Sequence, residues 1–124
     1  MLNAYQIGIN FFSWYRALSD SDTIPTSKGA LDRAMQKAAE GNNLSYIAKS
    51  FHFPILRTGM YCIELPEMEC AATDAGIIAP RNPEYTDYHF LISKHAAKKI
   101  LGRTKKVPEM QDFVSKVLEN LDKP

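Results

Sequence analysis

Apolar residues recur at helical spacing in the first part of the chain. Asn3 is a residue type that caps helices, and the stretch that follows it, 4–18, carries apolar side chains on two neighbouring stripes. A helix that is apolar on two sides must be covered by other elements or by a second subunit. The pattern therefore predicts an N-terminal helix that lies inside a core or in a dimer interface.

Five further stretches show the pattern and the end signals of helices. Each begins with a capping serine or with a proline suited to the first turn, and a helix-ending glycine or proline follows most of them. The helices are expected at Ser27–Glu40, Ser45–Phe51, Pro66 to the residues before Gly76, Ser93–Leu101 with Gly102 as terminator, and Pro108–Leu121. In the first of them, the inward residues are expected to be Leu31, Ala34, Met35 and Ala38.

Two short strands are predicted late in the chain, at 77–79 and 88–92. The polar stretch "PRNPEYTD" between them has the composition of a turn, so the strands should form an antiparallel hairpin. The stretch "SDSDTIPTS", 19–27, has the composition of a loop. Residues 55–65 fit a strand as well as a helix, because Gly59 lowers helix propensity by about 1 kcal/mol.

Composition places the chain among proteins that fold on their own. With 124 residues and 45% hydrophobic content, it is long enough to form one domain, 1–124, without a metal or a disulfide. It has no apolar run of about 18 residues, so we expect a cytoplasmic protein that does not enter the membrane. Cys62 and Cys70 match no redox or disulfide pattern and are expected to be reduced thiols.

Positive charge is concentrated late in the chain, although the net charge is only +1. Within thirteen residues there are six cations and no acidic residue, namely Lys94, Lys98, Lys99, Arg103, Lys105 and Lys106. Such a cluster is either a solvated helix face or a binding surface for a polyanion.

The predicted order of elements is that of a winged helix, a helix-turn-helix variant whose hairpin flanks the recognition helix. The stretch "LSYIAKSFHFP", 44–54, resembles the first helix and turn of helix-turn-helix modules. The stretch "AGIIAPRNPEYTDYHFLISKHAAKKIL" resembles the wing of the MarR and PadR families of bacterial repressors. The expected fold is therefore mainly α with a small antiparallel hairpin, a winged helix-turn-helix with extra N- and C-terminal helices.

The resemblance implies a DNA-binding transcriptional regulator that acts as a homodimer through terminal helices, here 1–19 and 108–122. The residues expected at double-stranded DNA are Lys49, His52, Arg57, Thr58, Arg81, Asn82, Lys94, Lys98, Lys99 and Arg103. One of them, His52, lies between two phenylalanines and has the alternative of a partly buried structural residue.

A second hypothesis keeps the same fold but gives it a protein partner. The middle segment carries Glu64, Glu67, Glu69 and Asp74, and carboxylates repel the phosphates of a duplex unless they are turned away. A winged fold with an acidic middle then becomes an interaction module for a basic protein, as an accessory or inhibitory factor of a mobile element. Neither hypothesis involves catalysis, a cofactor or a metal, because the cysteine spacing does not suit zinc and no glycine-rich phosphate loop occurs.

Overall fold

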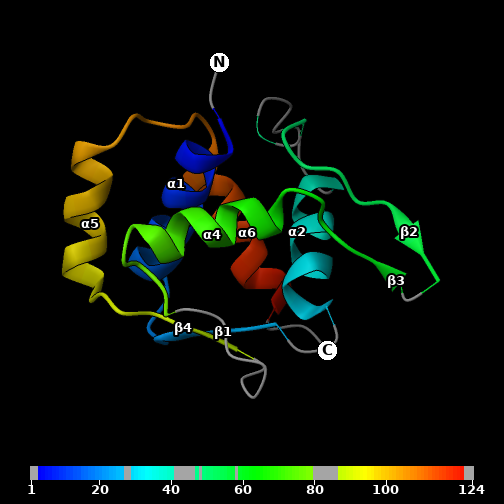
Figure 1. The fold of residues 1–124 in the computed structure, drawn as a ribbon, viewed down its shortest axis with the longest axis horizontal. Helices are drawn as coiled ribbons and strands as arrows, with labels where there is room; N and C mark the ends of the chain where they lie inside the picture. Colours follow the sequence, from blue (N-terminus) through cyan, green and yellow to red (C-terminus); the bar gives the residue numbers. More distant parts are fainter. Residues whose placement is uncertain are drawn as a thin grey trace.

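Five helices and four short strands form the part of the chain that is described by the computed structural model, residues 3–26, 29–40, 47, 49–57, 59–79 and 87–121 (Figure 1). The helices are α1 (Ala4–Leu18), α2 (Ala30–Glu40), α4 (Leu65–Asp74), α5 (Lys94–Arg103) and α6 (Met110–Leu121). The strands are β1 (Thr23–Pro25), β2 (Ile55–Leu56), β3 (Gly59–Met60) and β4 (Asp87–His89). A mainly helical fold with a small antiparallel sheet is thus confirmed.

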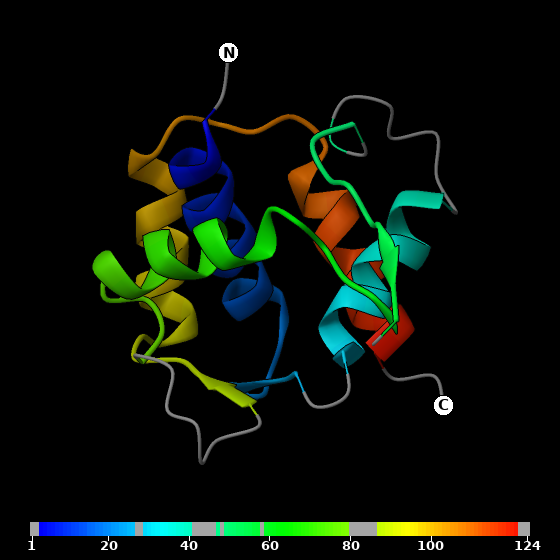
Figure 2. The same ribbon diagram turned by 45° about the vertical axis from the view of Figure 1, so that its right-hand side comes forward.

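Helix α1 lies at the centre of the molecule. Its first turn is closed by a capping box, in which Asn3 and Gln6 exchange side-chain and backbone hydrogen bonds of 2.8 and 3.1 Å. Helices α4, α5 and α6 all pack against it (Figure 2). Other helices of the same chain therefore cover much of the apolar surface of α1.

Helices α1 and α4 approach each other at backbone distance. Gly8 is buried between them, and a Cβ atom placed on it would lie 2.7 Å from the Cα and 2.8 Å from the carbonyl oxygen of Met68. No side chain fits at that distance from a backbone. Glycine at position 8 therefore sets the spacing between the two helices.

Helices α2 and α6 pair with each other and close the other side of the core. The predicted inward residues of α2 are all buried, and Phe51 stacks on Phe113 of α6 with ring centroids 5.1 Å apart. The third predicted helix is described only in part: Ile47 is helical and buried, whereas residues 49–50 form a turn and 51–54 have no regular secondary structure. Its predicted first residue, Ser45, lies outside the described residues, as does the predicted cap of the second helix, Ser27.

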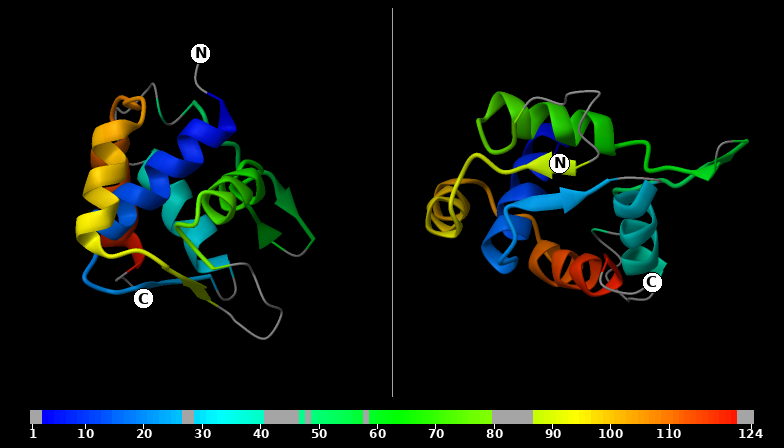
Figure 3. Two further views of the ribbon diagram at one scale, coloured as in Figure 1. Left: turned by 60° about the vertical axis from the view of Figure 1, so that its left-hand side comes forward. Right: turned by 90° about the horizontal axis from the view of Figure 1, so that it is seen from below.

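The two strands predicted at 77–79 and 88–92 lie antiparallel but pair only in one isolated bridge, and the two-stranded sheet forms between β4 and another segment. Ile78 pairs with Phe90, and the Ala79 amide donates to the His89 carbonyl at 2.8 Å. On its other edge, β4 pairs antiparallel with β1, which lies in the stretch predicted to be a loop (Figure 3). That prediction was wrong for Thr23–Pro25, because the strand depends on a partner more than sixty residues away rather than on its own polar composition.

Two predicted helix ends differ from the structure. Helix α5 runs through Gly102 to Arg103, since Gly102 does not adopt the left-handed conformation with which glycine ends helices. Helix α6 begins at Met110 rather than at Pro108, because Glu109 has a φ of 68° and interrupts the helical geometry. Within the described residues, no helix combines the length and the apolar character of a membrane span.

Strands β2 and β3 form a hairpin, so Ile55–Leu56 and Gly59–Met60 take the strand alternative that the sequence left open. The two strands pair antiparallel, with Ile55 opposite Met60 and Leu56 opposite Gly59. Gly59 has a φ of 116°, a value that other residues rarely adopt, which explains a glycine at the start of β3. The hairpin projects from the body of the molecule (Figure 1).

We predict that Gly8→Ala destabilises the protein, although alanine is the better helix former. The added methyl group would meet the backbone of Met68, so the free energy of unfolding should fall by about 1–3 kcal/mol, the usual cost of overpacking. Gly102→Ala is the matched control, because nothing lies within 4 Å of its Cβ position, and it should be neutral or stabilising by up to about 1 kcal/mol. Urea unfolding followed by circular dichroism measures both, and equal stabilities would contradict the proposed helix contact.

Candidate nucleic-acid interface

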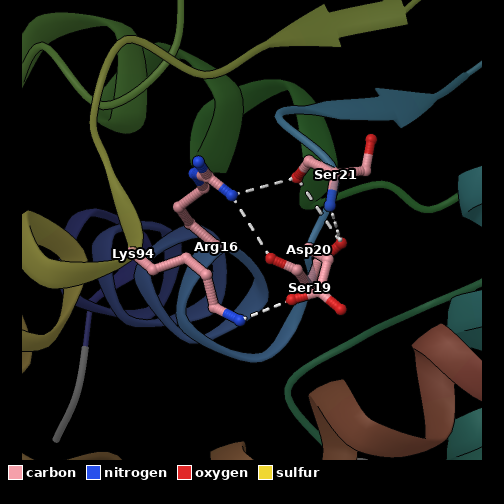
Figure 4. A network of polar contacts seen from close by, with 5 residues as sticks. All are labelled: Arg16, Ser19, Asp20, Ser21 and Lys94. Carbon is pink, nitrogen blue, oxygen red and sulfur yellow. Dashed lines mark hydrogen bonds and ion pairs between the residues drawn. The ribbon is translucent and has the colours of Figure 1, made fainter.

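A network of polar contacts holds the start of α5 against the end of α1. The Arg16 guanidinium donates from Nε to the Ile92 carbonyl at 2.9 Å and from Nη1 to the carbonyls of Ser19 and Ser21, each at 3.2 Å. Beside it, Lys94 Nζ lies 2.7 Å from Asp20 Oδ1, and Figure 4 shows this ion pair next to the arginine. The lysine lowers the pKa of the Asp20 carboxyl below its usual value by hydrogen bonding and by charge attraction. Lys94, predicted to contact phosphate, is thus engaged within the chain.

The outer face of α5 and the residues after it form an exposed basic surface. Ala97 is buried against α1, with Ile100 and Leu101 half-buried, so the opposite face of the helix points to solvent. Five exposed cations make up what we call the α5 basic surface: Lys98, Lys99, Arg103, Lys105 and Lys106. No acidic residue occurs between positions 94 and 106. Lys105 and Lys106, like the others, belong to the basic cluster that the sequence singles out.

The other described residues of the predicted site lie elsewhere. Lys49, His52 and Arg57 belong to the segment that leads into the β2–β3 hairpin, at the opposite end of the molecule from α5 (Figures 1 and 2). The expected convergence of these residues with the late cations on one surface is therefore wrong. Thr58, Arg81 and Asn82 lie outside the described residues.

His52 is an exposed residue rather than a partly buried one. Its side chain is 65% exposed, its Nδ1 lies 2.7 Å from Glu64 Oε2, and its backbone amide donates to Glu64 Oε1 at 2.7 Å. The Ile63 backbone amide also donates to the His52 carbonyl at 3.0 Å. Together these contacts join the residues before the hairpin to the residues after it.

Helix α4 precedes the sheet at the position where a winged helix carries its recognition helix. Its exposed residues are Pro66, Glu67, Cys70 and Asp74, with Leu65, Met68, Ala71 and Ala72 turned to the core. An exposed face with two carboxylates and no cation repels phosphate. The charge of α4 thus opposes insertion into a DNA groove.

The β2–β3 hairpin exposes apolar side chains that the periodicity of the sequence did not single out. Ile55 is 80% exposed and Leu56 is 54% exposed, and Tyr61 and Ile63 are also exposed. A two-stranded hairpin leaves both of its faces open unless another element covers one of them. The sequence signal was the run "ILRTGMYCI", in which apolar residues surround a glycine turn.

A cleft of about 620 Å³ opens between α1, the end of α5 and the start of α6. Its apolar wall comes from Trp14, Leu101, Val107, Pro108 and Met110. This volume is within the range of small-molecule sites in proteins. Sequence reasoning could not find the cleft, because its residues come from three segments that meet only in the folded chain.

Asn10 ties the connection between α5 and α6 to the wall of this cleft. The side chain is only 2% exposed, and its Nδ2 donates to the Gln6 carbonyl at 3.1 Å and to the Lys105 carbonyl at 3.0 Å. A buried amide that satisfies two carbonyls fixes the path of the chain at that point. The positions of Lys105 and Lys106 beside the cleft thus depend on Asn10.

The two cysteines are free thiols with different surroundings. Burial raises the pKa of the Cys62 thiol to about 12, and its backbone amide donates to Asp32 Oδ2 at 3.0 Å. Cys70 is exposed on α4. Among the residues whose positions are described, no group of three or more His, Cys, Asp and Glu side chains is arranged to hold a metal ion.

Comparisons with protein families, with curated proteins and with solved structures found no match to this chain. The candidate site therefore has to be judged by its own charge and geometry.

We predict that the two thiols differ strongly in reactivity. In the native protein at pH 8, Ellman's reagent should modify Cys70 quickly, whereas Cys62 should react only after unfolding, because the thiolate is the reactive form and burial disfavours it. Absorbance at 412 nm counts the modified thiols, and Cys70→Ser should remove the fast phase. Two fast thiols in the native wild type would contradict the buried position of Cys62.

Proposed function

We propose that the protein is a non-enzymatic nucleic-acid-binding protein that uses the α5 basic surface. The observation that carries the proposal is the set of five exposed cations on one side of α5 and its C-terminal extension, with no acidic residue among them. Lysine and arginine bind phosphate by charge and hydrogen bonding, and such contacts dominate the affinity for nucleic acid.

Five cations on one surface are enough for measurable binding, although the net charge of the protein is only +1. If all five cations neutralise phosphates, the logarithm of the affinity for duplex DNA should fall with a slope of about −4.5 against the logarithm of salt concentration. Affinity would then drop about 500-fold between 50 and 200 mM salt. The concentration of charge at one end, rather than its total, makes this binding possible.

The arrangement of strands also favours this class of function. A two-stranded sheet of β1 and β4, with an isolated bridge from Ile78 to Phe90 after α4, is compatible with the layout of a winged helix. We nevertheless place the nucleic acid on α5, because the exposed face of α4 is acidic. A role as a dimeric transcriptional regulator on double-stranded DNA remains a prediction from the sequence.

The double substitution Lys98→Ala with Lys99→Ala tests the proposal. It should weaken binding to a 15-base-pair DNA duplex and reduce the salt slope by about 0.9 for each phosphate that the variant no longer neutralises. The matched control is Lys37→Ala with Lys116→Ala, which removes the same charge from exposed positions on α2 and α6 and should leave the slope near the wild-type value. Fluorescence anisotropy at 25 to 200 mM salt measures the slope, and identical slopes for the two variants would refute the assignment to α5.

A second candidate function is protein binding through the β2–β3 hairpin. It is favoured by the exposure of Ile55 and Leu56, aliphatic side chains that sit on a projecting element. The exposed Glu67 follows the hairpin in the chain, which favours a partner with a basic group beside an apolar centre, whereas Glu64 is already engaged by His52. Among the middle-segment carboxylates, Glu69 accepts a hydrogen bond from the Tyr88 hydroxyl and is a poor choice for a binding test.

For this candidate, Ile55→Ser with Leu56→Ser should abolish capture of a specific partner from an extract of the native host. Leu91→Ser is the control, because Leu91 is 60% exposed but lies outside the hairpin. A captured protein has to be identified, purified and shown to bind the wild type and the control alike. If the hairpin variant retains that partner, the hairpin is not its binding site.

A further inference from the structure

We propose that the cleft beside the α5 basic surface receives an unpaired base, so that the protein prefers single-stranded nucleic acid to a duplex. The inference rests on the proposed function and adds the class of nucleic acid. Two neighbouring features carry it: a row of exposed cations, and an apolar cleft of about 620 Å³ with an aromatic wall. Proteins that bind single strands combine a basic track for the backbone with aromatic side chains on which bases stack.

The cleft and the basic surface share the residues that a bound strand would have to follow. Lys106 lines the cleft and belongs to the α5 basic surface, and Arg103 follows Gly102, another lining residue. The hydrogen bond from Asn10 to the Lys105 carbonyl holds this segment against α1. A strand whose phosphates contact Lys105 and Lys106 therefore passes the mouth of the cleft.

The lining of the cleft suits both the apolar face and the polar edge of a base. Trp14, with Leu101 and Val107, offers an apolar wall for the face of the ring. The edge of a base carries both donors and acceptors of hydrogen bonds. Around the cleft, Lys106 and Gln111 can donate, and the carboxylate of Asp112 can accept.

Gly102 lines the cleft without adding a side chain to it. It lies inside α5, where glycine is less favourable than alanine, and it does not adopt a left-handed φ. A Cβ at this position would have nothing within 4 Å. Neither backbone conformation nor crowding therefore calls for glycine here, which makes position 102 suitable for adding bulk at the cleft.

A duplex cannot use this cleft without disruption. Its bases are stacked and paired, and extracting one costs a few kcal/mol, whereas the bases of a single strand are free to turn outward. The acidic exposed face of α4 offers a duplex no compensating groove contacts. The preference for single strands thus follows from the cleft, and the phosphate affinity from the cations.

The test compares a 15-nucleotide oligothymidylate with a 15-base-pair duplex, using the full chain. Trp14 is the only tryptophan, so its fluorescence reports the cleft directly. The oligothymidylate should bind more tightly than the duplex at equal salt and should quench the emission of Trp14. Gly102→Leu should fill the cleft, weaken oligothymidylate binding about 5- to 150-fold, the reduction expected for one stacked base, and leave duplex binding unchanged.

Gly102→Ala is the matched control and should bind both nucleic acids like the wild type. Gly102→Met fills the same space with a more flexible side chain and repeats the measurement should the leucine variant unfold by circular dichroism. The inference is overturned if the filled variants bind oligothymidylate as the alanine control does, or if saturating oligothymidylate leaves Trp14 emission unchanged. Duplex binding that persists in that case leaves the proposed function standing, whereas no binding of either nucleic acid at 25 mM salt overturns both.

Discussion

Helix α1 is apolar on two sides, and such a helix is stable in water only when other elements cover it. Helices α4, α5 and α6 supply that cover, and the approach of α4 is as close as a backbone contact at Gly8 permits. Helix α5 belongs to the group of helices around α1, whereas α2 packs on the far partner of that group, α6. The β2–β3 hairpin projects at the opposite end of the molecule from α5 (Figure 1).

The position of α5 follows from polar contacts as much as from apolar ones. Its first turn is tied to the end of α1 by Lys94 and Asp20, and the chain after its last turn is held by the Asn10 amide. With only Ala97 fully buried, the helix is a surface element fastened at both ends. The cations between these two attachment points are left to solvent, and the cleft opens where the chain turns from α5 into α6.

The molecule therefore presents two chemically different ends. One end carries concentrated positive charge beside an aromatic cleft, which favours an anionic polymer with exposed bases. The other carries exposed aliphatic side chains on a hairpin, which favours an apolar protein surface. Two separate surfaces are compatible with one protein that joins a nucleic acid to a protein partner, and neither surface requires catalytic residues.

The sequence by itself determined the elements whose signals are local. The Asn3 cap, the amphipathic pattern of α2 and α6, and the Gly76 turn before the sheet depend on residues a few positions apart, and all were predictable. The density of cations around α5 was equally visible, because charge needs no partner to be counted. Tertiary structure alone decided the pairing of Thr23–Pro25 with β4, the separation of His52 from Lys98, and the cleft around Trp14. Each of these depends on contacts between segments that are distant in the sequence. Local sequence patterns do not show which of the many possible long-range contacts buries the most apolar surface.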